Sequence, residues 1–481
     1  MAQKIVTSGR IKEDTMFIKQ FYTNCLSEAA YYVESGGQAA VIDPLRDTDQ
    51  YVAFARERGA RITYIFETHF HADFVSGHLE LARQTGAPIV YGPGTRTRFP
   101  IHVARDGESF SIGEVTLEVI HTPGHTVESC CYLLKDEKGA PYCLFTGDTL
   151  FVGDVGRPDL SSGNLGSEEL ASMMFDSLAR LSRLPDTVIV YPAHGPGSSC
   201  GKNLGPGTST TIGEQKNSNY AMQATDREAF ISLVTEGLQA PPRYFQTSAR
   251  INREGYGNLE ELMGRSDRAL TVSGFKDLVS GGALVLDTRE PEDFTRGFVP
   301  GALNIGLKGR FAEWAGMLLD YRQPVVLVTD PGLEQETIVR LARVGLETVR
   351  GYLKGGMEAW TAASEPRDMI IGVEPDELAM DMQFDKKLRI LDVRHPAEYA
   401  AGHVQGAHNL PLEDMADPGA LAALSEMQNL YVHCQSGYRS VIACSVIKRQ
   451  GFHNLRNVEG GFDHMQTYPE LTLVREKEVQ D

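Results

Sequence analysis

Histidine and aspartate side chains gather in four short clusters in the first half of the sequence. Each cluster follows a run of apolar residues. An isolated histidine in a turn is usually an ordinary polar residue, whereas four such clusters in this order point to a metal site built from separate loops. The clusters contribute His69, His71, Asp73 and His78 from residues 68–78, His125 from 122–126, Asp148 from 146–149 and His194 from 191–195.

A second candidate for chemistry is a cysteine near the end of the chain. Cys434 follows an apolar run, residues 430–433, and stands before a helical stretch, residues 441–450. A sulfur at the start of a helix lies among backbone N–H groups, which lower the thiol pKa and stabilise a thiolate or persulfide. We therefore predict a nucleophile rather than a structural cysteine. The loop between strand and helix consists of Gln435, Ser436, Gly437, Tyr438 and Arg439, and the arginine adds a positive charge.

The histidine and aspartate clusters need strands that bring them together. Apolar, strand-like runs end in all four clusters, at residues 62–68, 115–122, 142–147 and 188–192. A sheet whose strand ends converge can hold imidazoles and a carboxylate around one point. We therefore expect one site at the ends of these strands.

The second half of the chain repeats itself. Leu286–Arg289 returns as Leu391–Arg394, and Gly355–Met357 returns as Gly460–Phe462. Each copy alternates apolar strands with helical segments, which predicts two small α/β domains with parallel sheets. The predicted organisation is a metal domain at residues 1–245, a linker at 246–265, and two repeats at 266–366 and 370–478.

The order of the metal-ligand clusters resembles that of the metallo-β-lactamase superfamily, over about residues 15–245. The resemblance implies an αββα sandwich, and hence an α/β multidomain protein. Members that bind two zinc ions carry a histidine directly after the aspartate of the first motif, where this chain has Phe74. A phenyl ring cannot bind a metal and places apolar bulk where the second ion would lie. The departure favours a single-metal branch that resembles the persulfide dioxygenases.

That resemblance implies one Fe(II) per chain, held by His69, His125 and Asp148. Two histidines and one carboxylate leave three positions on ferrous iron for a persulfide sulfur and O2. A closed tetrahedral zinc site would leave none. The implied reaction is the oxidation of a small persulfide to sulfite and a thiol. The side chains expected around these ligands, or facing the substrate, are His71, Asp73 and His194.

Two further residues are candidates for contact with the substrate. Arg157 stands in a stretch similar to one that shapes the substrate side in this family. Its guanidinium suits a carboxylate of glutathione or a phosphate of coenzyme A, and an ion pair with Asp159 is the alternative. Cys200, in a Gly/Ser-rich loop, is predicted to receive or relay sulfur near the iron, or else to be an incidental exposed cysteine.

The last domain resembles the rhodanese fold, and the second half fits two tandem copies. Cys434 would then carry a transferable sulfur as a persulfide. Cysteine phosphatases of related fold have one more residue between the cysteine and the arginine, so phosphatase activity is the weaker alternative. The first repeat has no cysteine, and its corresponding loop, residues 328–332, offers only Thr or Asp. We predict that it is catalytically silent and acts as a spacer or docking surface.

The chain as a whole resembles persulfide dioxygenase–rhodanese fusions, which serve sulfide detoxification and assemble into homo-oligomers. The expected sequence is oxidation of glutathione or coenzyme A persulfide with O2 to sulfite, followed by transfer of sulfane sulfur from Cys434 to sulfite to give thiosulfate. One alternative is a zinc thioester hydrolase of the glyoxalase II kind, which Phe74 argues against. Another is a sulfur carrier or persulfide sensor that uses Cys434 alone.

Composition limits the remaining possibilities. The 481 residues correspond to about three domains. The net charge of −18, without a long run of Lys or Arg, argues against nucleic-acid binding. Met1 to Lys12 lacks the apolar stretch of a signal peptide and no 18-residue apolar run occurs, so we expect a cytoplasmic protein with no membrane partner. Seven cysteines without paired spacing fit a reducing compartment.

Overall fold

The computed structural model describes residues 16–160, 165–238 and 240–475. The chain folds into two units, residues 1–259 and 260–481. The N-terminal segment Met1 to Lys12 and the end of the last predicted domain, residues 476–478, lie outside the described residues. Among the helices in the described ranges, none has the length and apolar character needed to span a membrane.

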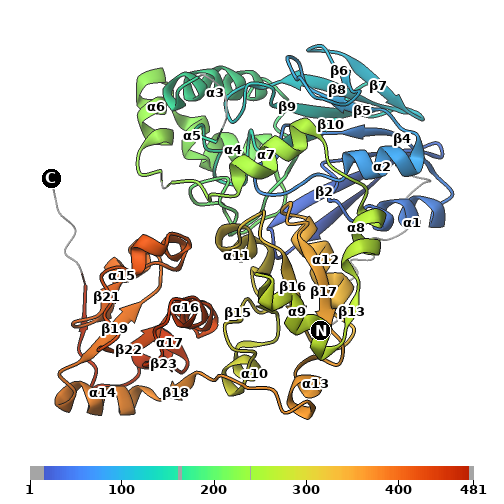
Figure 1. Ribbon diagram of the computed structural model, residues 1–481. Coiled ribbons are helices and arrows are strands. Elements are labelled where there is room, and N and C mark those ends of the chain that lie inside the picture. Colours follow the sequence, from blue (N-terminus) through green and yellow to red (C-terminus); the bar gives the residue numbers. More distant parts are fainter. Residues whose placement is uncertain (1–15, 161–164, 239, 476–481) are drawn as a thin grey trace. The chain divides into compact units, whose positions relative to one another are not determined.

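Two six-stranded sheets form the frame of the first unit (Figure 1). In β8 (Val115–His121), buried and partly exposed side chains alternate. By contrast, β2 (Glu28–Ser35) is buried almost throughout, because both faces of its sheet are covered. One sheet has the order β1 (Phe17–Thr23), β2 (Glu28–Ser35), β3 (Gln38–Ile42), β4 (Arg61–Phe66), β5 (Ile89–Tyr91) and β6 (His102–Val103). The other has the order β12 (Thr210–Thr211), β11 (Ile189–Pro192), β10 (Pro141–Gly147), β9 (Cys130–Lys135), β8 (Val115–His121) and β7 (Ser109–Ile112).

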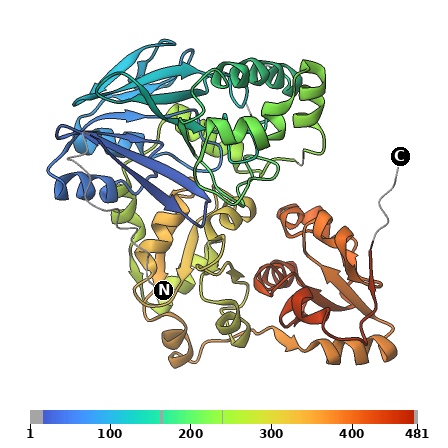
Figure 2. The same ribbon diagram turned by 180° about the vertical axis from the view of Figure 1, so that it is seen from behind.

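The core of this unit lies between the two sheets, with helices on the outer faces (Figure 2). Aromatic side chains from both sheets, including Phe66, Tyr132 and Phe145, fill the centre. Helices α1 (Asp49–Glu57) and α2 (His78–Thr85) cover the first sheet. The longest helix on the second sheet, α3 (Ser167–Leu181), packs there together with α6 (Arg227–Thr235). These four layers confirm the αββα sandwich that the sequence predicted.

The segment predicted as a linker, residues 246–265, is mostly helical, and the division between the two units, between Leu259 and Glu260, falls within it. It forms α7 (Phe245–Glu254) and most of α8 (Leu259–Ser266). In α7 the buried positions recur at helical spacing and belong to the first unit. Two short helices, α4 (Ile212–Ser218) and α5 (Tyr220–Gln223), precede α6.

The second unit contains two five-stranded sheets whose strands all pair in parallel. The first runs in the order β13 (Ala269–Leu270), β17 (Val349–Leu353), β16 (Val325–Val328), β14 (Leu284–Asp287) and β15 (Leu303–Asn304). The second repeats that pattern with β18 (Ile371–Val373), β23 (Leu455–Val458), β22 (Asn429–His433), β19 (Leu388–Asp392) and β21 (His408–Asn409). A two-stranded pair, β20 (His403–Val404) and β24 (Leu473–Val474), accompanies the second sheet.

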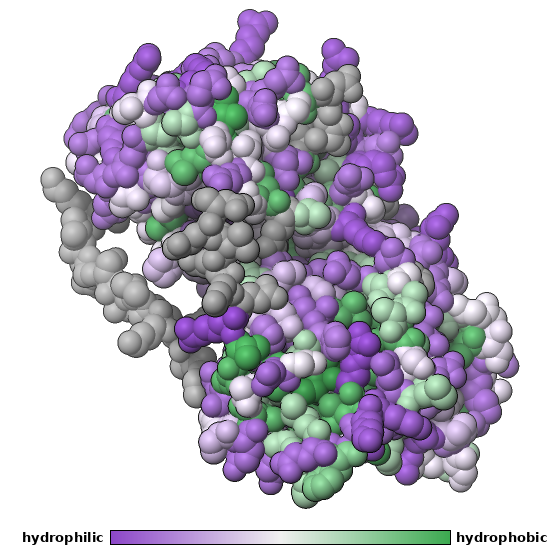
Figure 3. Space-filling model, turned by 90° about the vertical axis from the view of Figure 1, so that its left-hand side faces the viewer, coloured by the Kyte–Doolittle hydropathy of each residue, from purple (hydrophilic) through white to green (hydrophobic). Residues whose placement is uncertain are grey.

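Helices connect these parallel strands, as parallel pairing requires. In the first repeat they are α9 (Val272–Ser280), α10 (Pro291–Arg296), α11 (Phe311–Leu318), α12 (Glu334–Ala342) and α13 (Gly356–Ala362). In the second they are α14 (Pro375–Phe384), α15 (Pro396–Ala401), the 3-10 turns Leu412–Ala416 and Pro418–Leu421, α16 (Tyr438–Arg449) and α17 (Gly461–Met465). Large apolar side chains, among them Met380, Phe384 and Met427, are exposed in the second repeat, and Figure 3 shows apolar surface on this unit.

Candidate functional site

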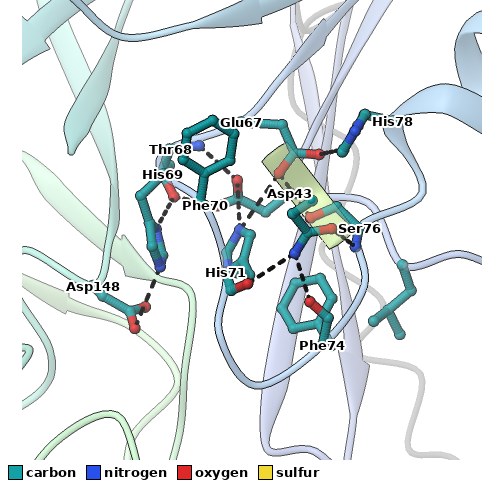
Figure 4. A network of polar contacts seen from close by, with 12 residues as sticks. Asp43, Glu67, Thr68, His69, Phe70, His71, Phe74, Ser76, His78 and Asp148 are labelled. Atoms are coloured by element: carbon teal, nitrogen blue, oxygen red, sulfur yellow. Dashed lines mark hydrogen bonds and ion pairs between the residues drawn. The ribbon is translucent and has the colours of Figure 1, made fainter. Parts of the chain in front are cut away.

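The first histidine of the site is oriented by a chain of hydrogen bonds that begins at the end of β3. The Thr68 hydroxyl donates to Asp43 Oδ2 over 2.9 Å and lies 3.0 Å from His69 Nδ1. Because the hydroxyl hydrogen is used on Asp43, Thr68 Oγ1 accepts from His69, which places the imidazole proton on Nδ1. His69 Nε2 is therefore left with a free lone pair, and it points toward Asp148 (Figure 4).

The next two clusters bring His125 and Asp148 to the same point from the ends of β8 and β10. His125 Nδ1 donates to the carbonyl of Arg157 over 2.9 Å, so its Nε2 is also free to bind a metal. The two Nε2 atoms lie 3.7 Å (His69) and 3.5 Å (His125) from Asp148 Oδ2. These separations are too long for hydrogen bonds. They fit atoms bound to one ion, since ligands about 2.1 Å from a metal lie roughly 3–3.5 Å apart.

The protonation of these groups also suits a metal. Burial lowers the pKa of His125 to about 4 and holds that of His69 well below its usual range, so both rings are neutral at neutral pH. Burial raises the pKa of Asp148 to about 6, although His194 opposes the shift. Among the described residues, no N–H or O–H group donates to the Asp148 carboxylate. A buried carboxylate in this state is stabilised by a cation, so His69, His125 and Asp148 could together hold a metal ion.

A second cluster, His71, Asp73 and His194, meets the first at Asp148. His194 Nε2 lies 3.5 Å from Asp148 Oδ1 and 3.5 Å from Asp73 Oδ2, while its Nδ1 faces the Ser27 carbonyl at 3.2 Å. The sequence placed all three residues around the ligands, and the structure brings them there. His194 is set as a metal ligand would be, with its Nε2 toward the shared carboxylate.

The His71 ring faces two carboxylates, those of Asp43 and Glu67. Its Nε2 lies 3.1 Å from Asp43 Oδ1 and 3.6 Å from Glu67 Oε2, as Figure 4 shows. Burial disfavours its charge, but the two carboxylates raise the pKa of His71 to about 10. The ring of Phe74 is fully buried and packs against the His71 imidazole, with centroids 4.3 Å apart. Apolar bulk thus stands against one member of the second cluster, and that Phe74 excludes a second ion stays a prediction.

One residue that fixes the loop of the first cluster was not predicted from the sequence. Asn252, fully buried on α7, donates to the carbonyls of His71 and Phe74, both over 2.8 Å. Its Oδ1 accepts from the Ser76 N–H at 2.9 Å. Helix α7, which lies in the segment predicted as a linker, therefore holds the loop of the first cluster at three points. The signal was present, because Pro241-Pro242 and Gly255 bracket a run without helix breakers.

The Cys434 loop joins β22 to α16. Gly437, with φ +109°, donates its N–H to Cys434 Sγ over 3.1 Å. The thiol donates in turn to Ser440 Oγ over 3.6 Å, and the Ser440 hydroxyl donates to the Gly437 carbonyl over 3.0 Å. Ser440 was not predicted from the sequence. The Gly437 N–H can stabilise a negative sulfur. Ser436 is exposed, and Gln435 accepts from Arg394 at 3.0 Å.

Arg439 does not act as an unpaired positive charge. Its two terminal nitrogens bind the Glu398 carboxylate at 2.6 and 2.7 Å. The expected cation is therefore neutralised within the same domain, and the group that donates to the sulfur is the Gly437 N–H. Next to the loop is a cavity of about 400 Å³, lined in part by Arg394, Glu398 and Gln435.

Comparison with known proteins agrees with this arrangement. A model of the metallo-β-lactamase superfamily matches residues 23–194, and one of the rhodanese-like domain matches residues 271–363 and 374–467. A crystal structure of a metallo-β-lactamase from Staphylococcus aureus is 34% identical, with a TM-score of 0.63, and the match covers 71% of this chain and 99% of that one. The chain belongs to the metallo-β-lactamase superfamily. Two tandem rhodanese-like domains follow its metallo-β-lactamase domain, as the sequence predicted.

Other relatives resemble the first domain. Hydroxyacylglutathione hydrolases from Tolumonas auensis and Rhizobium johnstonii are 39% and 37% identical over 168 and 163 residues, in each case 34% of this chain. The chain spans about 60% of the length of these curated relatives. The structure of ETHE1 from Myxococcus xanthus is 31% identical with a TM-score of 0.43, and the match covers 49% of this chain and 98% of that one.

In the metallo-β-lactamase domain, Cys200 is buried, so the interpretation as an incidental exposed cysteine was wrong. Its Sγ lies within 4.8 Å of ligand atoms of Asp148 and His194. Burial, together with the Asp73 and Asp148 carboxylates, raises the pKa of Cys200 well above its usual range. Cys200 is thus a protonated thiol that borders the metal-binding cluster.

Arg157 forms the ion pair that the sequence left as an alternative. Its guanidinium binds Asp159 through two nitrogens at 2.8 and 2.6 Å. Its backbone links His125 to the Cys200 loop, since its carbonyl accepts from His125 and its N–H donates to the Cys200 carbonyl. A cavity of about 200 Å³ is lined by the residues that follow His69 and His125 in the chain and by two arginines of other segments. These lining residues include Phe70, Thr126, Arg96 and Arg253.

The first rhodanese-like domain lacks a nucleophile at the corresponding position. Its sheet and helices match those of the second, but β16 ends at Val328 and the next side chain is the buried Thr329, whose hydroxyl lies 3.1 Å from the Asp330 carbonyl. No cysteine occurs between Cys200 and Cys434. That this domain is catalytically silent stays a prediction.

Proposed function

We propose that the metallo-β-lactamase domain oxidises a small persulfide with O2 and that Cys434 transfers sulfane sulfur to the product. The observation that carries the proposal is the donor set: two neutral imidazoles and one buried carboxylate converge on a point, while Phe74 packs beside the neighbouring cluster. Three donors of this kind suit a non-haem iron that keeps open positions. We infer that His69, His125 and Asp148 hold one Fe(II) per chain.

The overall reaction balances without a further oxidant. A persulfide, O2 and water give the thiol, sulfite and two protons, so the terminal sulfur is oxidised and O2 is reduced. Ferrous iron, when bound, would overcome the spin barrier to the reaction of triplet O2 with a closed-shell sulfur. The protein holds the ligand rings in position through Thr68 and the Arg157 carbonyl.

The substrates are proposed to be the persulfides of glutathione or coenzyme A. The cavity beside the ligands supports a carrier with negative groups, because Arg96 and Arg253 line it. Arg157 remains a candidate for the substrate side, although its guanidinium already binds Asp159. Cys200 is proposed to receive or relay sulfur there, and its closeness to Asp148 supports this. Assembly into a homo-oligomer stays a prediction.

The second step takes place at Cys434. A second molecule of the small persulfide transfers its terminal sulfur to Cys434 and leaves as the thiol. The Cys434 persulfide then gives this sulfur to sulfite, which forms thiosulfate and returns the thiolate. The Gly437 N–H is positioned to stabilise the sulfur that is left. The two steps together would remove sulfide-derived persulfide as thiosulfate, which is the proposed role in sulfide detoxification.

The test is oxygen uptake by metal-analysed protein, purified without air, on addition of glutathione persulfide or coenzyme A persulfide. Rapid uptake with close to one iron per chain is the expected result, and the faster substrate identifies the carrier. Absence of uptake with both substrates in iron-loaded protein would refute the dioxygenase.

The second candidate function is a zinc-dependent thioester hydrolase. It is favoured by the likeness of the first domain to hydroxyacylglutathione hydrolases. Phe74 argues against it, since that position carries a histidine in two-zinc members. Bound zinc, with hydrolysis of an acylglutathione thioester and no oxygen uptake, would establish it in place of the dioxygenase.

A further inference from the structure

The side chain of Tyr438, the first residue after the Cys434 loop, binds the first rhodanese-like domain. Its hydroxyl donates to the Gly306 carbonyl over 2.7 Å. Burial raises the pKa of Tyr438, so the hydroxyl keeps its hydrogen and acts as a donor. Helix α16, which Tyr438 begins, continues the contact, because the Ser445 hydroxyl accepts from the Asn304 N–H at 3.1 Å.

The receiving surface is the Gly306–Gly309 segment, which lies between β15 and α11. It is shaped to the tyrosine ring: a Cβ added at Gly309 would stand 2.6 Å from Tyr438 Cε2, and one at Gly306 would stand 3.2 Å from the same atom. Glycine is therefore required at position 309 for space. Arg340 fixes the segment, because its guanidinium donates to the carbonyls of Leu307 and Gly309 at 2.5 and 3.3 Å.

The anchor lies next to the atoms that stabilise the sulfur. Gly437, which donates to Cys434 Sγ, is directly before Tyr438. Its backbone has a φ of +109°, a conformation that glycine adopts readily and few other residues do. A free loop would let this N–H turn away from the sulfur. With the tyrosine ring seated in the neighbouring domain, the N–H stays aimed at Sγ.

We infer that the first rhodanese-like domain, which has no nucleophile, is a positioning element for the sulfur-transfer loop of the second. Tyr438 is the positioning residue and the Gly306–Gly309 segment is its seat. This inference rests on the proposed role of Cys434 and gives the silent domain a part in that reaction. It also explains why the loop is followed by a large aromatic residue whose ring contacts another domain.

The test uses the full-length protein and three variants. Tyr438→Phe removes only the donated hydrogen bond, Gly309→Ala closes the seat, and Gly264→Ala is the control, because a Cβ there meets nothing within 4 Å. Two readouts are taken across pH: sulfur transfer from thiosulfate to cyanide, and alkylation of Cys434 by iodoacetamide, followed by mass spectrometry of the peptide that contains it.

We expect Tyr438→Phe to lower sulfur transfer about two- to tenfold, as for the loss of one hydrogen bond. The midpoint of Cys434 alkylation should move up by about half a pH unit, because a less fixed N–H stabilises the thiolate less well. Gly309→Ala should shift both further in the same direction, and Gly264→Ala should match the wild type. Wild-type midpoints and rates in Tyr438→Phe would overturn the inference, even if Gly309→Ala does not fold.

Failure of the proposed function has a different signature. A wild-type protein that transfers no sulfur to cyanide would refute the role of Cys434. In that case the alkylation profiles would still report whether Tyr438 controls the thiol.

Discussion

Replacing Asn252 by alanine is expected to loosen the metal-binding loop without touching a metal ligand. The side chain makes three buried hydrogen bonds, to the carbonyls of His71 and Phe74 and to the Ser76 N–H. Each group left without a partner costs about 1–3 kcal/mol. If water binds one of the three backbone groups, two remain without a partner, and the loop loses about 3 kcal/mol of local stability.

Amide hydrogen exchange measures this loss locally, which is preferable because a chain of several domains does not unfold in two states. In Asn252→Ala, peptides covering residues 67–78 should exchange about a hundredfold faster. Metal affinity should fall about tenfold, as is common when groups that orient ligands are removed. Asn252→Asp should retain the acceptor for Ser76 but set a carboxylate against two carbonyls, with a similar loss.

Asn217→Ala is the matched control, since this asparagine is exposed and makes a single bond within α4. Its exchange and metal affinity should equal those of the wild type. Exchange of residues 67–78 in Asn252→Ala within a factor of about two of the wild type would refute the view that α7 holds the loop.

Three further variants test the site. Asp148→Ala should remove nearly all bound metal, as measured by elemental analysis after dialysis; full occupancy would exclude Asp148 as a ligand. Phe74→His should raise the metal content from about one toward two per chain, because it supplies a ligand beside His71, Asp73 and His194; an unchanged content would show that Phe74 does not limit the stoichiometry. Cys200→Ser should slow oxygen uptake at least tenfold if the thiol relays sulfur, and wild-type uptake with wild-type products would remove Cys200 from the mechanism.

The convergence of the metal-binding residues was predictable because it follows from sheet geometry. His69, His125 and Asp148 each stand just after a strand, and the two sheets of the sandwich bring those ends together. The two repeats were likewise visible, since the repeated strand and turn residues keep their spacing along the chain.

What the sequence did not reveal depends on pairs that are far apart in the chain. Asn252 and His71 are separated by 181 positions, and Arg439 and Glu398 by 41. Neither residue has a spacing that marks its partner. The burial of Cys200 was hidden for another reason: its loop is rich in glycine and serine, a composition typical of exposed segments, yet its backbone binds Arg157.

The central claim is that two sites act in sequence, and the most direct test is the product formed by Cys434→Ser. On glutathione or coenzyme A persulfide with O2, the wild type should form thiosulfate. The variant should consume O2 at a similar rate and release sulfite instead. Equal yields of thiosulfate from the variant and the wild type would contradict the account.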